Sequence, residues 1–206
     1  MADGPVIQRA SERALRHGFG LAEIFEIVGD ARKQTDVPII LFSYFNPLLQ
    51  FGIKNFVTAS KGSGVDGVLV TDLVPEEAGE LSSALRANNL DLIFLVAPTS
   101  TDERLKLVAE RASGFIYAVS RAGVTGAREQ MSAEAEKLAT RVRRFSDLPV
   151  AVGFGISKPE HVADVWRYAD AAVVGSAIVS MIEESEETSD LVRRIGQFAA
   201  SLTAHG

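Results

Sequence analysis

The sequence predicts an α/β fold, because short apolar runs alternate along the whole chain with segments of helical periodicity. The apolar runs carry apolar side chains on both faces, which is typical of parallel strands covered by helices. The chain has 206 residues, of which 47% are hydrophobic and 23% are charged. That length is enough to bury one core, so we expect one domain spanning residues 1–206.

Six runs are predicted to be strands, because each is short, continuous and rich in β-branched residues. They are Val37–Phe45, Gly67–Thr71, Asp91–Ala97, Phe115–Ser120, Val150–Gly153 and Ala171–Gly175.

The segments between these runs have apolar residues at the i, i+3, i+4, i+7 spacing of a helix that buries one face. Such stretches begin at Leu21, Leu105, Ala135, Val162 and Leu191. Trp166 belongs to the fourth stretch and is predicted to pack in the core. Ser100 with Glu103, and Ser157 with Glu160, have the spacing of capping boxes at helix starts.

Two α/β architectures compete, a doubly wound open sheet and a closed (β/α)₈ barrel. The strand count favours the open sheet, because a barrel has eight strands over typically ~250 residues. The strand ends favour the barrel, where a phosphate site forms from the loops after the last two strands. We therefore predict an incomplete (β/α)₈ TIM barrel with about six of the eight parallel strands.

Glycine turns follow the last two predicted strands. Gly153-Phe154-Gly155-Ile156-Ser157 follows the penultimate strand, and Gly175-Ser176 follows the last one, directly before the helical segment Ala177–Ile182. Glycines let the backbone approach phosphate oxygens, and the free N–H groups of a helix start bind an anion without a lysine. The two turns together predict a site for a phosphorylated ligand. The alternative is that the glycines only permit tight turns.

A third loop leaves the fourth predicted strand as Ser120–Gly126 (SRAGVTG) and continues through Ala127–Met131. A loop of this length at the active face is typical of a lid that closes over a substrate. An ordinary flexible connection is the alternative.

Composition excludes several function classes. The net charge of -6 argues against nucleic acid as a partner, because phosphate backbones are bound by basic surfaces. The absence of cysteine excludes disulfides, zinc–thiolate sites and cysteine nucleophiles, and fits a cytoplasmic protein. No apolar run approaches the ~18 residues of a membrane span. His17, His161 and His205 have no metal-ligand spacing, so we expect no metal site.

Four segments, Ala2–Pro5 (ADGP), Tyr117–Gly126 (YAVSRAGVTG), Gly153–Ser157 (GFGIS) and Gly175–Val179 (GSAIV), occur in an order and spacing that resembles the tryptophan synthase alpha subunit family. The resemblance covers the whole chain. It implies cleavage of indole-3-glycerol phosphate into indole and glyceraldehyde 3-phosphate, without a cofactor. It also implies an alpha2beta2 assembly in which indole passes to a beta subunit that carries pyridoxal phosphate.

By this resemblance Asp3 would accept the indole N–H, Thr125 would close with the lid and bond to Asp3, and Tyr117 would line the pocket. Substrate and phosphate would be bound by Gly126, Gly153, Phe154, Gly155, Gly175 and Ser176. The indole ring would lie against Phe42, Leu69 and Leu95. Asn46 and Pro75 would lie on loops that face the beta subunit.

Several of these residues have a structural alternative. Asp3 beside Pro5 could be a helix N-cap, Tyr117 could be a core aromatic, and Phe42, Leu69 and Leu95 could be layers of the barrel core.

The chemistry needs a second carboxylate as a general acid and base, opposite the group that polarises the ring nitrogen. In the family this is a glutamate at the end of the second strand, upstream of the Asp-Gly-Pro turn with which this sequence begins. We therefore expect that the first two strands of the family are absent, that Met1 is not the natural start, and that the chain as written has little lyase activity. Asp72 is the nearest remaining carboxylate and is expected to orient loops.

Two other functions stay open. The chain could be a non-catalytic, phosphate-binding partner that modulates a beta subunit. It could also be another phosphate-binding barrel, such as an isomerase, although the lid sequence argues against this.

Overall fold

The computed structural model describes residues 3–119, 128–153, 155–185 and 189–203. Its strands are β1 (Ile40–Ser43), β2 (Gly67–Val70), β3 (Asp91–Val96), β4 (Ile116–Val119), β5 (Val150–Gly153) and β6 (Ala171–Ala172). Its α-helices are α1 (Pro5–Arg16), α2 (Leu21–Arg32), α3 (Phe45–Phe51), α4 (Ile53–Ser63), α5 (Gly79–Ala87), α6 (Asp102–Arg111), α7 (Arg128–Val142), α8 (Pro159–Val165), α9 (Ser176–Glu184) and α10 (Leu191–Thr203). A short 3₁₀ helix, η1 (Pro75–Glu77), precedes α5.

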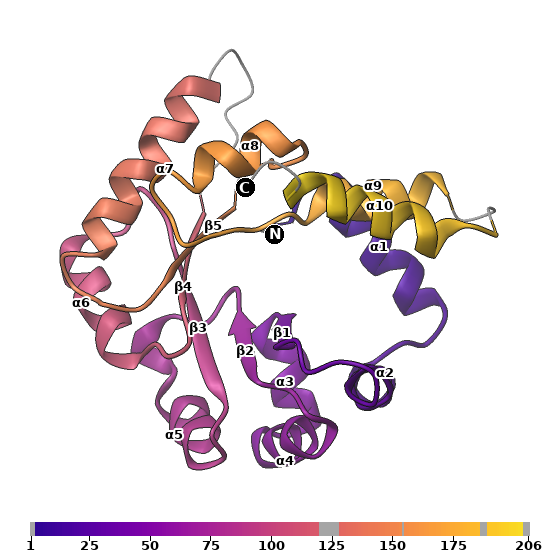
Figure 1. Cartoon of the computed structure of the whole chain (residues 1–206). Coiled ribbons are helices and arrows are strands. Elements are labelled where there is room, and N and C mark those ends of the chain that lie inside the picture. The colour runs from indigo at the N-terminus through magenta and orange to yellow at the C-terminus, as the bar shows by residue number, and fades with distance from the viewer. Residues whose placement is uncertain (1–2, 120–127, 154, 186–188, 204–206) are drawn as a thin grey trace.

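The strands form one parallel sheet in the order β1-β2-β3-β4-β5-β6. A doubly wound sheet would reverse its strand order at a switch point, whereas consecutive order is that of a barrel wall. Helices cover the outer side of this wall, and β1 and β6 lie at its two ends (Figure 1). The prediction of an incomplete barrel with six parallel strands is therefore confirmed.

One aromatic contact demonstrates how strongly the sheet curls. Phe42 on β1 and Tyr117 on β4 are three strands apart, which in a flat sheet corresponds to ~14 Å. Their ring centroids are 6.4 Å apart in an edge-to-face arrangement. The two side chains therefore meet across the concave inner face.

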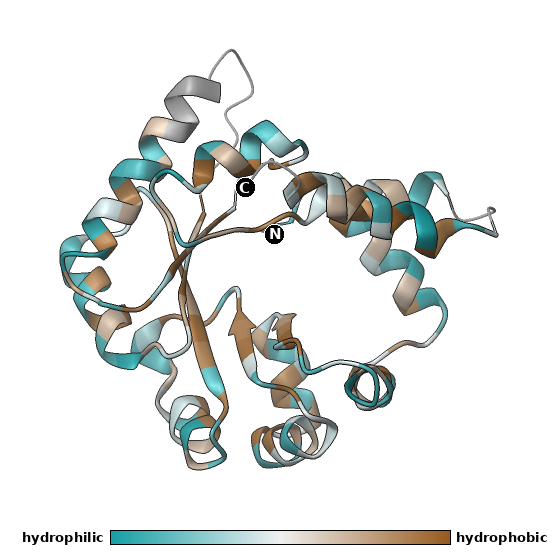
Figure 2. Ribbon diagram, in the orientation of Figure 1, coloured by the Kyte–Doolittle hydropathy of each residue, from teal (hydrophilic) through white to brown (hydrophobic). Residues whose placement is uncertain are grey.

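The main core lies between the sheet and the helices. The residues on the outer face of the strands are almost fully buried, and helix residues pack over them. These strands are mostly hydrophobic, as their brown colour in Figure 2 shows. The largest of these buried side chains are Phe56, Phe94, Leu48, Leu81, Leu85, Leu105, Ile116 and Leu138. Each contributes about 1.5–3 kcal/mol relative to an exposed position.

The two outermost strands are shorter than predicted. The ladder of β1 begins at Ile40, because the Ile39 N–H donates to the Asp66 carboxylate (2.7 Å) and Val37 is 66% exposed. The β6 ladder covers Ala171–Ala172, although Val173 N–H still donates to the Val152 carbonyl (2.8 Å). The limits of β5 are as predicted.

Three local predictions were wrong. Trp166 is 40% exposed, because α8 ends at Val165 and Trp166 is its C-cap rather than a core residue. Thr101, not Ser100, caps α6, and its hydroxyl accepts the Arg104 N–H (3.3 Å). Lys158 occupies the N-cap position of α8, where no side chain caps the helix, so Ser157 does not form the expected box.

Helix α1 joins distant parts of the chain. It packs against α9, where Arg9 and Arg13 both pair with Glu183, at 2.8 and 3.2 Å. In Figure 1 α1 accordingly runs beside α9. This contact holds α1, the helix that follows Asp3, against the last β/α unit of the chain.

Candidate active site

The Asp3 carboxylate lies at the carboxyl end of β1. Tyr44, the residue that follows this strand, donates its hydroxyl proton to Asp3 Oδ2 (2.5 Å). The Gln8 side chain holds the Asp3 carbonyl (2.7 Å). Asp3 is not the cap of α1, because Gly4 is the N-cap residue and no side chain caps the helix. The helix-cap alternative for Asp3 is therefore excluded, and its carboxylate lies on the rim where barrels place functional groups.

Tyr117 lies on the inner face of β4, between Leu95 of β3 and Ala151 of β5. Its hydroxyl and ring edge lie directly against the Cα of Gly153, where an added Cβ would be 2.1 Å from the hydroxyl oxygen. Burial raises the pKa of the phenol, so Tyr117 is a neutral hydrogen-bonding group at physiological pH. A glycine is required at position 153 to make room for this ring.

The three residues predicted to line an indole pocket share the inner face with Tyr117. Phe42 pairs in register with Leu69, and Leu95 pairs with Tyr117. Leu69 is 4% exposed, whereas Phe42 is 58% exposed and contacts Tyr117 across the concave face. The inner face therefore offers an apolar surface suited to a flat ring.

The two glycine turns follow the neighbouring strands β5 and β6, at the carboxyl ends of both strands. Gly153 ends β5, and Gly155 follows with φ +47°, a conformation that favours glycine. Gly175 is the N-cap of α9, and Ser176 is its first residue; both are exposed. The first N–H groups of a helix lack a carbonyl partner one turn earlier. In α9 the Ile178 N–H donates to the Gly175 carbonyl (3.0 Å), which leaves the N–H groups of Ser176 and Ala177 for an anion.

Some predicted site residues lie outside the described part of the chain. They are Thr125 and Gly126 in the predicted lid, and Phe154 in the first glycine turn. Their roles stay predictions. The helix after the lid begins at Arg128, earlier than the loop predicted through Met131.

Asp72 holds two loops of the rim together. It follows β2, and its carboxylate accepts the Phe45 N–H at the start of α3 (2.7 Å). This hydrogen bond joins the carboxylate to the backbone of another loop, which agrees with the expectation that Asp72 orients loops. Of the two residues expected on partner-facing loops, Asn46 is exposed, whereas Pro75 is buried.

Sequence analysis did not identify Tyr44, the residue that holds Asp3. The available signal was its position near the end of the predicted strand Val37–Phe45, since functional side chains gather at strand ends in barrels. The pairing itself joins residues 41 positions apart and required the fold.

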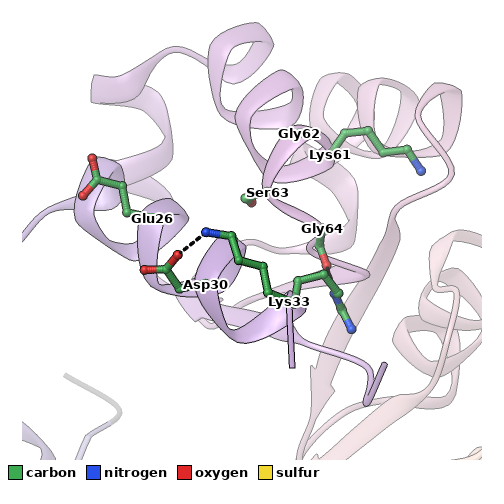
Figure 3. Close-up of a pocket in the computed structure, with 9 residues that line it drawn as sticks. Glu26, Asp30, Lys33, Lys61, Gly62, Ser63 and Gly64 are labelled. Carbon is green, nitrogen blue, oxygen red and sulfur yellow. Dashed lines mark hydrogen bonds and ion pairs between the residues drawn. The ribbon is translucent and has the colours of Figure 1, made fainter. Parts of the chain in front are cut away.

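A groove of about 670 Å³ lies between α2 and α4 (Figure 3). Gly64 in its lining precedes β2, so the groove lies at the amino ends of the strands, opposite the rim that carries Asp3. Lys33 in the groove pairs with Asp30 on the same helix (2.7 Å). The groove is therefore separate from the candidate site.

Within residues 3–119, 128–153, 155–185 and 189–203, no cluster of histidine and carboxylate side chains has the arrangement of a metal site. None of the helices in this part of the chain is long and apolar enough to cross a membrane.

Consecutive parallel strands, outer helices and functional groups on the carboxyl rim define a protein of the (β/α)₈-barrel class. The family model of the tryptophan synthase alpha chain matches residues 1–204. The chain therefore belongs to the tryptophan synthase alpha chain family.

Individual relatives agree with this assignment. The tryptophan synthase alpha chain of Solibacter usitatus is 48% identical over 202 residues, which is 98% of this chain and 76% of the relative. A chain in the structure of the tryptophan synthase a2b2 complex of Pyrococcus furiosus superposes with a TM-score of 0.91 at 40% identity, covering 99% of this chain and 82% of that one. The alpha subunit from Legionella pneumophila superposes with a TM-score of 0.88 at 35% identity, covering 98% and 75%.

Proposed function

We propose that this chain has the alpha-subunit function, the cleavage of indole-3-glycerol phosphate into indole and glyceraldehyde 3-phosphate. The observation that carries the proposal is the position of Asp3, whose carboxylate is held by Tyr44 on the rim instead of capping α1. Family membership supports the choice of substrate.

The reaction moves two protons and polarises a third. Carbon 3 of the indole ring gains a proton, the side-chain hydroxyl loses one as the carbon–carbon bond breaks to give the aldehyde, and the ring N–H is polarised. A carboxylate that accepts the ring N–H stabilises the tautomer protonated at carbon 3. Asp3 has this role: Tyr44 occupies Oδ2, and we assign Oδ1 to the indole N–H. Thr125 would bond to Asp3 when the lid closes.

The remaining site residues bind and orient the substrate. Phe42, Leu69 and Leu95 present the apolar inner face to the indole ring, together with Phe154, and Tyr117 borders the same surface. The phosphate would be bound by backbone N–H groups at Gly126, Gly155, Gly175 and Ser176. The helix dipole of α9 favours an anion at that position. Neither role requires a metal ion or a bound cofactor.

We expect the 206-residue chain alone to be a weak lyase. Asp72 lies two residues beyond the end of β2, and its Oδ1 is already bonded to the Phe45 N–H. It is poorly placed to act as the second acid and base. The same observation favours a second candidate function, a phosphate-binding partner that modulates a beta subunit without releasing indole.

The partner in this proposal is a beta subunit that carries pyridoxal phosphate and receives the indole, within an alpha2beta2 assembly in the cytoplasm. The structural relative from Pyrococcus furiosus belongs to such an a2b2 complex. No nucleic acid or membrane partner is proposed.

The test is indole release from indole-3-glycerol phosphate by the purified chain, with and without a tryptophan synthase beta subunit, and with Asp3→Asn as control. Slow release that Asp3→Asn abolishes would support the lyase. Stimulation of the beta subunit without indole release would support the non-catalytic partner. Absence of both, in a folded chain that also fails to bind phosphate, would refute both functions.

A further inference from the structure

We propose that His161 is a positioning residue for the first phosphate-binding turn, defined here as Gly155–Ser157. His161 is the third residue of α8, and its Nδ1 accepts the backbone N–H of Ser157 (3.1 Å). The side chain thus reaches back from the first turn of the helix, as the N3 residue of a capping box does, but its donor is Ser157, the residue before the N-cap Lys158. This inference rests on the proposed function, because it assigns a purpose to the same turn.

The imidazole of His161 is buried. His161 is 6% exposed, whereas charged and polar residues on a surface helix are usually solvated. Because Nδ1 accepts a hydrogen bond, it carries no proton, and the neutral imidazole has its proton on Nε2. The ring therefore supplies a fixed acceptor to the turn.

Two anchors then fix the backbone on the far side of Gly155. Ile156 is 2% exposed and packs in the main core, and Ser157 is held by His161. On the near side the chain is fixed by the ladder of β5, which ends at Gly153. Gly155 is the exposed residue between them, with φ +47°. The anchors restrict the backbone of Gly155, so that little conformational entropy is lost when the turn binds an anion.

His161 contacts the backbone of the turn, so it acts through the turn and not on the reacting atoms. It is therefore expected to affect the binding of the phosphate group. Its loss is expected to raise KM, and to lower kcat little, wherever turnover can be measured. A residue with a purely structural role would lower the amount of folded protein instead.

Two substitutions separate these roles. His161→Leu keeps a buried side chain of similar size but removes the acceptor. His161→Asn keeps an acceptor, because the amide oxygen of asparagine occupies the position of Nδ1. The probe is inorganic phosphate, titrated by calorimetry into the purified chain and both variants. Amide hydrogen exchange at Ser157 reports on the bond itself.

We expect His161→Leu to weaken phosphate binding about tenfold and to speed exchange at Ser157, and His161→Asn to stay within about threefold of the unsubstituted chain. Equal affinity in all three folded proteins would overturn the role of His161 and leave the proposed function intact. Equal loss in both variants would overturn it too, because the acceptor would not be what matters. Failure of the unsubstituted chain to bind phosphate would overturn the phosphate site itself, and with it the proposed function.

Discussion

At the scale of single residues, the decisive contact is the bond from Tyr44 to Asp3. A phenol that occupies one carboxylate oxygen fixes the orientation of the other, so the carboxylate is presented to a ligand at little entropic cost. This makes the two residues separable by mutation. Asp3 would contact the indole, whereas Tyr44 would act only through Asp3.

We predict that Asp3→Asn weakens binding of an unreactive analogue that keeps the indole ring and the phosphate by about 10- to 100-fold. The cause is the loss of a hydrogen bond to a charged acceptor, worth about 1.5–3 kcal/mol. Tyr44→Phe should weaken binding only about three- to tenfold, because the carboxylate remains. Isothermal titration calorimetry measures both. A Tyr44→Phe effect larger than that of Asp3→Asn would contradict this order of roles.

A second residue-scale prediction concerns Gly153. A Cβ at this position would meet the Tyr117 hydroxyl at 2.1 Å and its ring carbons at 2.7 and 2.8 Å, so Gly153→Ala should destabilise the fold by about 1–3 kcal/mol. Urea unfolding measures the loss. Tyr117→Phe should restore little, because the ring carbons stay, whereas Tyr117→Ala should remove the clash.

The control for Gly153→Ala is Gly29→Ala, since Gly29 lies inside α2 with nothing near its missing Cβ. This change should be neutral or stabilising by up to ~1 kcal/mol. Equal destabilisation by both substitutions would show that the contact with Tyr117 is not the cause.

Sequence reasoning could propose residues whose position follows from local patterns, and it missed residues whose role depends on a particular contact in the fold. The glycine turns could be placed because they follow strand ends, which apolar periodicity marks, whereas Tyr117 was proposed from the family resemblance. Tyr44 and His161 could not be assigned. The partner of Tyr44 is 41 residues away, and the His161 contact depends on where α8 begins, which sequence patterns locate poorly.

At the scale of secondary-structure elements, two similar arginine clamps lie at the amino ends of the strands. In each clamp an arginine at a helix end binds a backbone carbonyl and a carboxylate that precede a strand. Arg143, which follows α7, donates to the Tyr168 carbonyl (2.5 Å) and to the Asp170 carboxylate (2.9 Å). Asp170 in turn accepts the Val150 N–H at the start of β5 (2.8 Å).

The other clamp has the same form one half-barrel away. Arg32 at the end of α2 donates to the Gly64 carbonyl and to Asp66, and Asp66 accepts the Ile39 N–H just before β1. In both clamps the carbonyl lies two residues before the carboxylate. The clamps join each helix end to two neighbouring strands, which fixes where the ladders begin.

The Asp170 clamp should make stability depend on pH. The backbone N–H of Val150 and the Arg143 guanidinium lower the pKa of Asp170, against a smaller opposing effect of burial. A lowered folded-state pKa stabilises the protein above the unfolded value of about 3.9, and this contribution is lost as the pH falls through the folded value.

We therefore expect Asp170→Asn to reduce the loss of stability between pH 7 and about pH 3, by less than ~1 kcal/mol because the pair is half exposed. Urea midpoints at the two pH values measure this. Asp147→Asn is the control, since Asp147 is exposed and no hydrogen bond or ion pair is seen for it among the described residues. Equal pH dependence in Asp170→Asn and the unsubstituted chain would contradict the prediction.

The limits of the elements were predictable where the apolar run and the ladder coincide. They coincide for β5, which is paired on both sides. They differ for β1 and β6, which are paired on one side in the described sheet, because apolar side chains continue where hydrogen-bonded pairing has stopped. Hydropathy reports burial, and a ladder requires a neighbouring strand, so outer strands are the ones that sequence patterns overextend.

At the scale of the whole molecule, strand order could be expected from the barrel prediction, but the curvature could not be measured from sequence. It is visible in the contact between Phe42 and Tyr117 across the inner face. The position of α1 was also beyond sequence reasoning, because it depends on ion pairs that span 174 and 170 residues. These pairs carry a functional consequence, since Asp3 lies directly before α1.

The last prediction is that Glu183 keeps α1, and therefore Asp3, in place. Arg9 and Arg13 converge on this one carboxylate, and the hydrogen bond from Arg9 is the main cause that lowers the pKa of Glu183. Glu183→Gln should speed amide exchange in α1 severalfold at neutral pH, while amides of β3 and β4 in the central wall stay protected. Glu184→Gln, on the exposed neighbouring residue, should change amide exchange neither in α1 nor in β3 and β4.

Salt provides the second half of this test. Exposed ion pairs are screened by salt, so 1 M sodium chloride should speed α1 exchange in the unsubstituted chain and change little in Glu183→Gln. Analogue binding should weaken in parallel with α1 exchange, because a loosened α1 releases Asp3 from the rim. Faster exchange with unchanged binding would mean that Tyr44 alone holds Asp3. Unchanged exchange would mean that apolar contacts, and not the ion pairs, attach α1 to α9.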